Sequence, residues 1–446
     1  MTQAPSLSLV KRALSAHAAI GLLGGALLYL VCLTGTIVVF YEEFHRIEQQ
    51  DAPEMAEVDP GAVQRAVEAV LASEAGQTPT THLYVHIPVA DLPRTTITTD
   101  TQAVHVDRDG TIAAPEENGW SEFLLALHYT LNLPVLIGIT IVGILGVMIL
   151  ALALSGVVAH PRIFRDAFRL RTRSKGGVAL ADWHNRLSVW TLPFSVAVAL
   201  TGSIIGLATV TGYGMAAHYY DGDIEALYAP IFGGEAEADP APAGIPNVAA
   251  ALRHMQTAYA AVEPTYVIVH DPGTAGQHIQ IVAEHSRRLI FGEYYAFDAE
   301  GNFEGTAGMA DGAIGQQAAA STYNLHFGNY GGLPVKIAYF LFGLALTAIC
   351  ATGTYIWLGK RRRRGLNEPR LLAAWDGVVW GVPIALTATF LARLAMGNGA
   401  PFTATFWLLG FAIVIANILL ANRYRTRRPL QAAFLLAVIA SVAIAL

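Results

Sequence analysis

The sequence predicts a membrane protein: an all-α bundle of about seven transmembrane helices that carries two small α+β domains outside the bilayer. Of the 446 residues, 54% are hydrophobic and only 14% are charged, whereas globular proteins carry about 25% charged residues. The apolar residues gather in runs of roughly 20, the length that crosses a bilayer. This composition excludes a disordered chain, a collagen-like chain and an ordinary cytosolic enzyme.

The sign of the charges predicts which side of the membrane each loop faces. Of the 28 Lys and Arg residues, 19 lie in four short segments near predicted helix ends, and 30 of the 34 acidic residues lie in two long loops. Loops rich in Lys and Arg stay in the cytoplasm, so we expect a cytoplasmic N-terminus and two outer loops. Seven crossings place the C-terminus outside as well. The basic segments are 11–12, 161–186, 359–370 and 422–428.

The first helix is expected to be a retained anchor. Lys11 and Arg12 precede it, as in a signal peptide, but its apolar run is too long and lacks a small-residue cleavage site.

Four long helices, of which this is the first, alternate with two outer domains, and three more helices follow. The predicted ranges are 1–41 for transmembrane helix 1, 42–127 for the first outer domain, 128–160 for helix 2, 161–186 for a basic cytoplasmic loop, 187–211 for helix 3, 212–325 for the second outer domain, 326–358 for helix 4 and 359–446 for three additional transmembrane helices.

Both outer domains show the same succession of short elements. Each begins with an amphipathic helix, and segments with the two-residue alternation of β-strands follow. One helix packed on a small antiparallel sheet fits each domain. The expected helices are 59–75 and 246–262, and the expected strands are 80–87, 94–99, 103–107, 265–270, 277–283 and 290–298.

Residues 1–358 contain the same unit twice. His17 and His184 each open a helix, and a Thr-Gly pair ends 18 residues after each of them. His128 and His326 each follow a leucine, and the glycine of a Ser-Gly or Thr-Gly pair follows 28 and 27 residues later. Both units start on the same side of the membrane, so the two-fold axis of the repeat should stand along the membrane normal. That axis would bring His17 opposite His184, and His128 opposite His326.

These matched histidines suggest haem. A six-coordinate haem iron takes two axial ligands, which two histidines on different helices of a bundle can supply. The pairs His17/His184 and His128/His326 would hold two haems, one in each leaflet. His160 competes for the first site, as a substitute ligand or a propionate contact. For any one of these histidines alone, an interfacial position at the lipid headgroups is the commoner explanation.

Other redox groups are limited by the sequence. The two cysteines, Cys32 and Cys350, form no CxxC or CxxCH pattern, which excludes a Cys-ligated iron–sulfur cluster and covalently attached haem c. No Gly-rich loop opens a βαβ unit, so NAD(P)H or flavin is not expected on a Rossmann domain. Electrons would have to come from a donor protein or a membrane quinol.

The chain resembles the PepSY-associated transmembrane helix family over about residues 1–365. The resemblance is carried by the repeated pattern of inner His and Thr-Gly, an outer α/β module, and Leu-His followed by Ser-Gly or Thr-Gly. Residues 155–166, which read SGVVAHPRIFRD, and the segment Asp182-Trp183-His184-Asn185 look especially typical. The last three helices fall outside this pattern.

The resemblance implies a bacterial inner-membrane protein of iron metabolism with two PepSY-like periplasmic domains. Its better understood relatives are dihaem b reductases of ferric siderophores, and His17, His128, His184 and His326 correspond to the family's haem-ligating histidines. We therefore expect a transmembrane electron conduit that reduces a ferric siderophore or another periplasmic ferric acceptor.

Two other functions remain open from the sequence. One is a non-redox binding or sensory membrane protein, since PepSY-like modules also serve in recognition. The other is a permease, for which the support is thin because the tail residues Asp376 and Arg393 are the only candidate intramembrane charges. The run Lys360–Arg364 is read as a topology anchor, so no nucleic-acid partner is expected.

Overall fold

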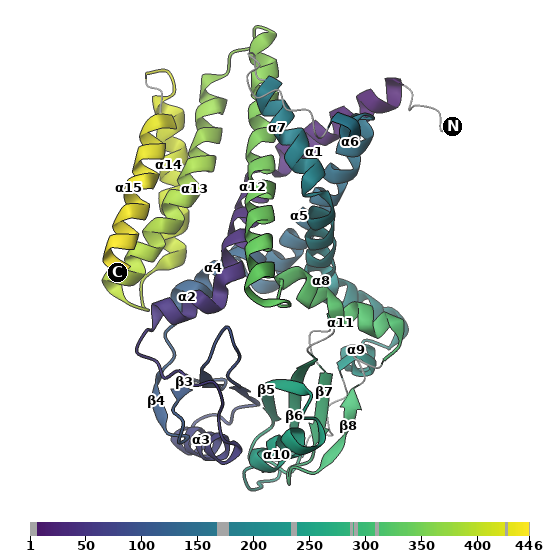
Figure 1. The fold of residues 1–446 in the computed structure, drawn as a ribbon, viewed down its shortest axis with the longest axis vertical. Helices are drawn as coiled ribbons and strands as arrows, with labels where there is room; N and C mark the ends of the chain where they lie inside the picture. The colour runs from purple at the N-terminus through teal and green to yellow at the C-terminus, as the bar shows by residue number, and fades with distance from the viewer. Residues whose placement is uncertain are drawn as a thin grey trace. The chain divides into compact units, whose positions relative to one another are not determined.

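The computed structural model describes residues 7–166, 178–232, 239–285, 289, 293–307, 312–423 and 427–445. The chain forms two compact units, which are described separately below. The helical unit consists of residues 1–41, 119–208 and 331–446, and the sheet unit consists of residues 42–118 and 209–330. Figure 1 labels their elements.

The protein is a multi-pass membrane protein. Among the described residues, six helical segments are long and apolar enough to cross a membrane. The seventh predicted segment falls on α15 (Arg427–Ala445), a helix of 19 residues, and its crossing stays a prediction. The first segment, Ser8–Glu48, comprises most of α1 (Leu7–Ile37), the 3₁₀ turn Val38–Phe40 and α2 (Tyr41–Glu48). The other five are α5 (Val135–Ala159), α8 (Leu192–Tyr219), α12 (Gly332–Arg363), α13 (Pro369–Met396) and α14 (Phe402–Leu420).

Three of the predicted helices begin later than expected, because a short helix and a break precede each of them. His128 lies in α4 (Gly119–Tyr129), and Leu131 and Asn132 then adopt φ values of 57° and 54° before α5 begins. Backbone in this left-handed region cannot continue a right-handed helix, and Pro134 lacks the N–H that an uninterrupted helix would use. The expected single helix 128–160 is therefore wrong at its start. The other two short helices are α7 (Val178–Trp190) before α8 and α11 (Ile314–Phe327) before α12.

The basic segment 161–186 contains structure as well. It includes α6 (Ile163–Asp166) and the first part of α7. Residues 167–177 of that segment lie outside the described part of the chain.

Of the last three helices, α13 makes polar contacts with both α1 and α12. The Trp375 indole donates to the Ala351 carbonyl of α12 at 3.0 Å, and the Tyr29 hydroxyl of α1 donates to the Val379 carbonyl at 2.8 Å. Asp376 is only 6% exposed and accepts from the Tyr355 hydroxyl at 2.6 Å. Buried acids inside a membrane unit are costly unless they are paired, so α13 docks on α1 and α12 through specific polar contacts. Figure 1 shows α13, α14 and α15 side by side.

The sheet unit contains one eight-stranded antiparallel sheet, where two separate small sheets were predicted. Its strand order is β4-β3-β2-β1-β5-β6-β7-β8, so the two halves meet at β1 and β5. That seam pairs His82 with His270 and His86 with Tyr266. The strands are β1 (His82–His86), β2 (Thr95–Thr98), β3 (Ala103–Val106), β4 (Ile112–Pro115), β5 (Val262–His270), β6 (His278–His285), β7 (Glu293–Phe297) and β8 (Phe303–Ala307).

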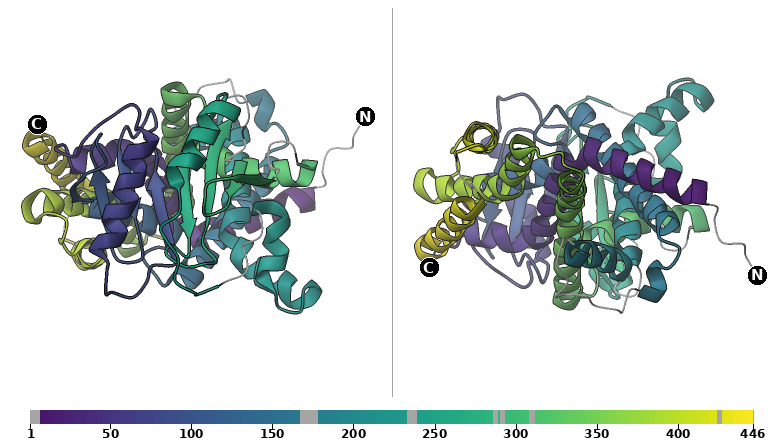
Figure 2. Two further views of the ribbon diagram at one scale, coloured as in Figure 1. Left: turned by 90° about the horizontal axis from the view of Figure 1, so that it is seen from below. Right: turned by 90° about the horizontal axis from the view of Figure 1, so that it is seen from above.

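One face of this sheet is covered by α3 (Pro60–Ser73) and α10 (Val248–Ala258), as the left view of Figure 2 shows. Their apolar sides bury a continuous core with side chains from both halves of the sheet, including Leu83, Val267 and Ile281. Each half thus supplies one helix and four strands, and the six strands predicted from alternation are all present. Helices α2 and α9 (Ile224–Phe232) and strands β4 and β8 were not predicted.

Candidate functional site

His17 is held by a neighbouring helix through one ring nitrogen. Its Nδ1 lies 3.1 Å from the Leu152 carbonyl and 3.1 Å from the Ser155 hydroxyl, both on α5. The next residue, Gly156, lies beside the imidazole, and a Cβ there would come within 3.4 Å of His17 Cε1. The hydroxyl and the glycine of the Ser-Gly pair therefore form a seat for the ring.

His184 of α7 is held in the same way by α12. Its Nδ1 lies 2.9 Å from the Thr352 hydroxyl, and a Cβ on Gly353 would come within 3.5 Å of its Cε1. The second half of the repeat therefore uses its Thr-Gly pair as the first half uses Ser155 and Gly156.

His128 shows the tightest version of this arrangement. Its Nδ1 lies 3.1 Å from the Val31 carbonyl and 3.3 Å from the Thr34 hydroxyl of α1. A Cβ on Gly35 would lie 2.6 Å from His128 Cε1, closer than real contacts allow. Only glycine at this position leaves room for the ring where it lies.

The direction of these hydrogen bonds follows from the hydroxyl groups. Ser155, Thr34 and Thr352 each donate their hydroxyl proton to a carbonyl in their own helix, at 3.2, 2.9 and 2.7 Å. Because each hydroxyl already donates its one proton to a carbonyl, it can only accept a hydrogen bond from the imidazole. Nδ1 therefore carries the histidine proton. Nε2 then keeps its lone pair, the state in which histidine ligates a metal.

His17 and His184 lie close to each other within the helical unit. Their ring centroids lie 6.4 Å apart and their planes are 87° apart. Metal–imidazole bonds of about 2 Å each, with the two ring half-widths, span roughly 6 Å. The separation therefore suits one metal ion with an imidazole on either side.

The donor set decides what kind of metal group suits this pair. Among the described residues, no group of three or more His, Cys, Asp or Glu side chains is placed to hold a metal ion. A two-histidine site fits a group that brings its own equatorial ligands, as a porphyrin does. The residues present are thus compatible with a bis-histidine haem.

A family model described as the PepSY-associated TM region matches residues 14–360. The chain belongs to this family. Another similar protein is the "Uncharacterized protein PA4219" of Pseudomonas aeruginosa, 26% identical over 333 residues that cover 69% of this chain and 82% of that protein. The PepSY-associated region contains all five candidate histidines and ends before α13, so α13–α15 lie outside it.

The two remaining candidate histidines lie at helix ends. His160 follows α5 as its C-terminal cap. His326 lies in the last turn of α11, where its ring contacts Phe327. His326 belongs to the sheet unit and His128 to the helical unit, so the predicted pairing of these two stays a prediction.

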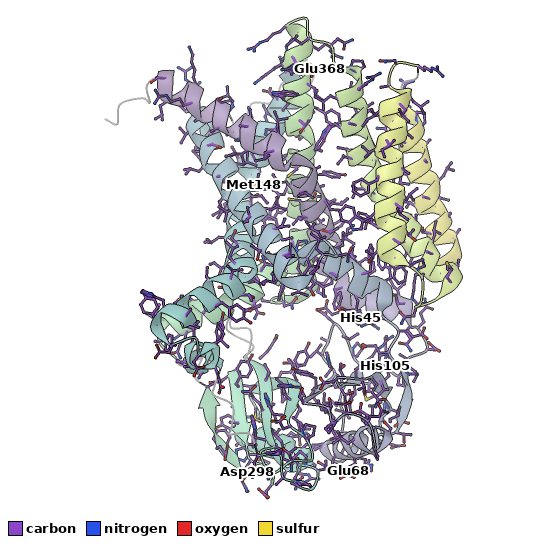
Figure 3. All side chains as sticks on the ribbon, turned by 180° about the vertical axis from the view of Figure 1, so that it is seen from behind. His45, Glu68, His105, Met148, Asp298 and Glu368 are labelled. Atoms are coloured by element: carbon purple, nitrogen blue, oxygen red, sulfur yellow. The ribbon has the colours of Figure 1, made fainter. Side chains whose placement is uncertain are left out.

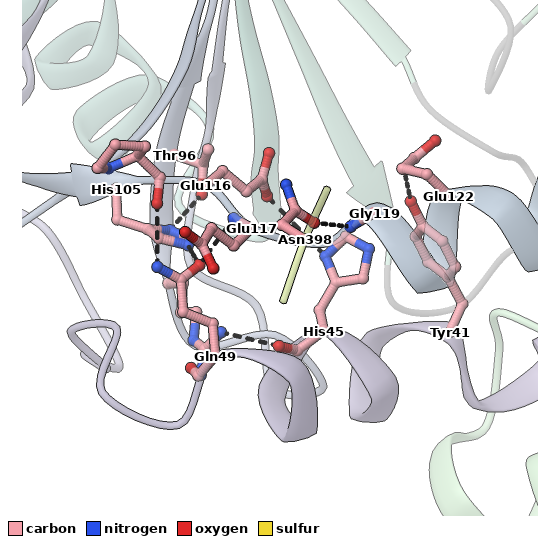
Figure 4. A network of polar contacts seen from close by, with 12 residues as sticks. Tyr41, His45, Gln49, Thr96, His105, Glu116, Glu117, Gly119, Glu122 and Asn398 are labelled. Carbon is pink, nitrogen blue, oxygen red and sulfur yellow. Dashed lines mark hydrogen bonds and ion pairs between the residues drawn. The ribbon is translucent and has the colours of Figure 1, made fainter. Parts of the chain in front are cut away.

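A separate polar cluster of the sheet unit, drawn in Figure 4, was not predicted. His105 is 3% exposed, with Nδ1 3.1 Å from the Thr96 hydroxyl and Nε2 2.9 Å from Gln49 Oε1. Arg94 is 2% exposed and donates to the carbonyls of Gln49 and His45 at the end of α2, at 2.7 and 3.2 Å. Burial lowers the pKa of His105 to about 4, with the Arg94 charge as a further cause. Figure 3 labels His45 and His105 on the ribbon of the whole chain.

A row of three histidines crosses the seam of the sheet. His82, His270 and His278 are direct partners on adjacent strands, with ring centroids 4.9 and 4.3 Å apart. Burial, with His278 and His82 as further causes, lowers the pKa of His270 to about 4. In the sequence these histidines look like unrelated strand residues, and only the register brings them together.

Proposed function

We propose that this PepSY-associated protein is a transmembrane electron conduit that binds two haem b groups and reduces a periplasmic ferric acceptor, a ferric siderophore in the first instance. The observation that carries the proposal is the His17/His184 pair, with centroids 6.4 Å apart and each Nδ1 bonded to a neighbouring helix. His128 and His326 would hold the second haem, as the sequence repeat suggests. His160 is the alternative ligand at the first site.

The chain's own residues would orient the ligands. A hydrogen bond from Nδ1–H to a carbonyl or hydroxyl fixes the tautomer and the ring orientation, and it raises the basicity of Nε2. Leu152, Ser155 and Thr352 serve this purpose for the first pair, and Val31 and Thr34 serve it for His128. Bound haem would supply a one-electron carrier whose potential depends on those hydrogen bonds.

The charge distribution supports a direction for the electron. Lys and Arg gather near one set of helix ends, which favours an inner-membrane protein with a cytoplasmic N-terminus and a periplasmic sheet unit. Electrons would enter near His17 and His184 from a donor protein or a quinol, and leave near His128 and His326. Reduction of Fe(III) to Fe(II) weakens its bonds to hard oxygen ligands, which releases iron from a siderophore.

The test is spectroscopic. The purified full chain is expected to show the bands of low-spin haem b after dithionite reduction, with two haems per chain. His17→Ala and His184→Ala should each remove one haem, and His128→Ala and His326→Ala should each remove the other. His160→Ala tests the alternative ligand and should retain both haems.

Two outcomes would contradict the proposal. A colourless protein would favour the non-redox binding or sensory function. Loss of haem from His160→Ala together with full haem in His17→Ala would reassign the first site.

A further inference from the structure

The two cysteines of this chain meet each other inside the helical unit. The sequence has only these two, Cys32 and Cys350, 318 positions apart. Their Sγ atoms lie 3.7 Å apart, one on α1 and the other on α12. Among 446 residues, a chance placement of two thiols in contact is rare, so the pair calls for an explanation of its own.

The backbones of α1 and α12 run close together where the thiols meet. The hydroxyl groups of Thr36 and Thr347 lie 3.5 Å apart, and a Cβ on Gly343 would come within 2.6 Å of Thr36 Oγ1. On the other side of the cysteines, Gly25 lies beside Thr354. Small residues on both sides of the pair thus hold the two helices near enough for a covalent link between short side chains.

The internal repeat does not account for the cysteines. Cys32 lies 15 residues after His17, and the residue 15 after His184 is Ala199. Cys350 lies three residues before Gly353, and the residue three before Gly156 is Ala153. Each half of the repeat has one of the two cysteines, and the other half has an alanine at the matching position. Packing alone is therefore satisfied by alanine, and the thiols add a chemical property.

We propose that Cys32 and Cys350 form a reversible disulfide that links α1 to α12, with a membrane quinone as the oxidant. Two S–H bonds break and one S–S bond forms; the two electrons and two protons pass to the quinone, which becomes a quinol. A reduced thiol pair reverses the step.

The position of the pair favours a lipid-soluble oxidant. Both cysteines lie within helices long and apolar enough to cross the membrane. Cys32 is buried, whereas Cys350 is partly exposed on the surface of α12. A disulfide needs the sulfurs about 2 Å apart, so closure requires an approach of under about 2 Å, which side-chain rotation and a small helix shift supply.

The disulfide would connect the anchors of two candidate ligands. Val31 and Thr34, which bond His128, lie on either side of Cys32 in the sequence. Ile349 and Thr352, which bond His184, lie on either side of Cys350. Oxidation would therefore fix the spacing of the helices that orient both rings. This inference concerns the chain itself and stands whether or not haem is bound.

The experiment uses the purified full chain in lipid nanodiscs, first reduced and then freed of reductant without oxygen. Decylubiquinone is the probe, because its fully substituted ring does not add thiols. Denaturation with a maleimide counts the free thiols, and intact mass measures the loss of two hydrogens. We expect two free thiols per chain to fall to none, with one quinol formed per chain, and reductant to restore both.

Single variants make the test specific. Cys32→Ser and Cys350→Ser should each keep one thiol that quinone leaves unchanged, and serine is small and polar enough to preserve the packing. The thermal unfolding midpoint should rise on oxidation in the wild type and stay constant in both variants. Two thiols that survive quinone in the wild type, or a disulfide that joins two chains on a non-reducing gel, would overturn the proposal.

Discussion

The imidazoles of His17 and His184 lie 6.4 Å apart between centroids, with their planes nearly perpendicular. The two residues lie 167 positions apart in the sequence, on α1 and α7. Their rings contact two further helices, α5 and α12. Four helices thus cooperate to place two rings. The spacing depends on the hydroxyl-glycine seats as well as on the histidines.

Thr352→Val removes the hydroxyl that accepts from His184 Nδ1 and keeps the side-chain volume. Loss of such an orienting partner typically weakens metal affinity by about 10- to 100-fold. We expect the purified variant to contain haem and to lose it to an apo-myoglobin scavenger faster than the wild type does. Thr140→Val on α5, whose hydroxyl bonds the Leu136 carbonyl of its own helix, is the matched control. Equal haem loss from both variants would show that the hydroxyl has no orienting role.

Alanine should be harmful at one glycine seat and harmless at another. In Gly35→Ala the new Cβ would lie 2.6 Å from His128 Cε1, whereas in Gly353→Ala it would lie 3.5 Å from His184 Cε1. Ala also favours a helix over Gly by about 1 kcal/mol. Gly353→Ala should therefore keep or raise the thermal midpoint, and Gly35→Ala should lower it and displace His128. A neutral Gly35→Ala would mean that the ring moves aside freely.

Acid should destabilise the sheet unit through three of its buried and partly buried histidines. Burial lowers the pKa of His86, His105 and His270 to about 4, below the ordinary value of 6.5. The unfolded chain then binds more protons between pH 6.5 and 4, so stability is fully present above pH 6.5 and falls toward pH 4. His270→Gln should reduce that slope by up to about 1 kcal/mol per pH unit. Unfolding of the full chain in urea at pH 7, 6, 5 and 4 measures the slope of the unfolding free energy against pH. The same slope in His270→Gln and the wild type would contradict a lowered pKa for His270.

Glu284 should act in the opposite direction. Burial, with Glu263 on the adjacent strand as a further cause, raises its pKa to about 7. The folded state then holds a proton that the unfolded state releases above pH 4.5. Because of this group, the free energy of unfolding falls as the pH rises from 4.5 toward 7. Glu284→Gln should be more stable than the wild type at pH 8 and nearly equal at pH 4. The exposed Glu304 provides the control, and Glu304→Gln should leave both values unchanged.

Local patterns predicted most elements but not how the two halves combine. Alternation located six strands and both covering helices, because each is a period that a few residues determine. The pairing of β1 with β5 joins residues such as Val85 and Val267, and no local period encodes such a distant register. The prediction of two small sheets was wrong on this point, because each small sheet leaves an open edge strand and the structure pairs two of these edges, β1 and β5.

The candidate site was predicted as residues but not as geometry. The repeat located His17 and His184 and also the Ser-Gly and Thr-Gly pairs, yet the sequence did not indicate that each pair seats a histidine of another helix. The break between α4 and α5 was missed, although Pro134 marked it. The contact between Cys32 and Cys350 has no sequence signal, because it depends on how α1 and α12 pack.

The seam of the eight-stranded sheet has a consequence for biosynthesis. β5 begins 176 positions after β1 ends, and ribosomes add about 5–20 residues per second. Roughly 10–35 s therefore pass in which β1 has been made and its partner has not. An edge strand left unpaired for so long can pair with other chains, so the yield of folded protein will depend on translation speed and on chaperones that shield His82–His86 until the second half arrives.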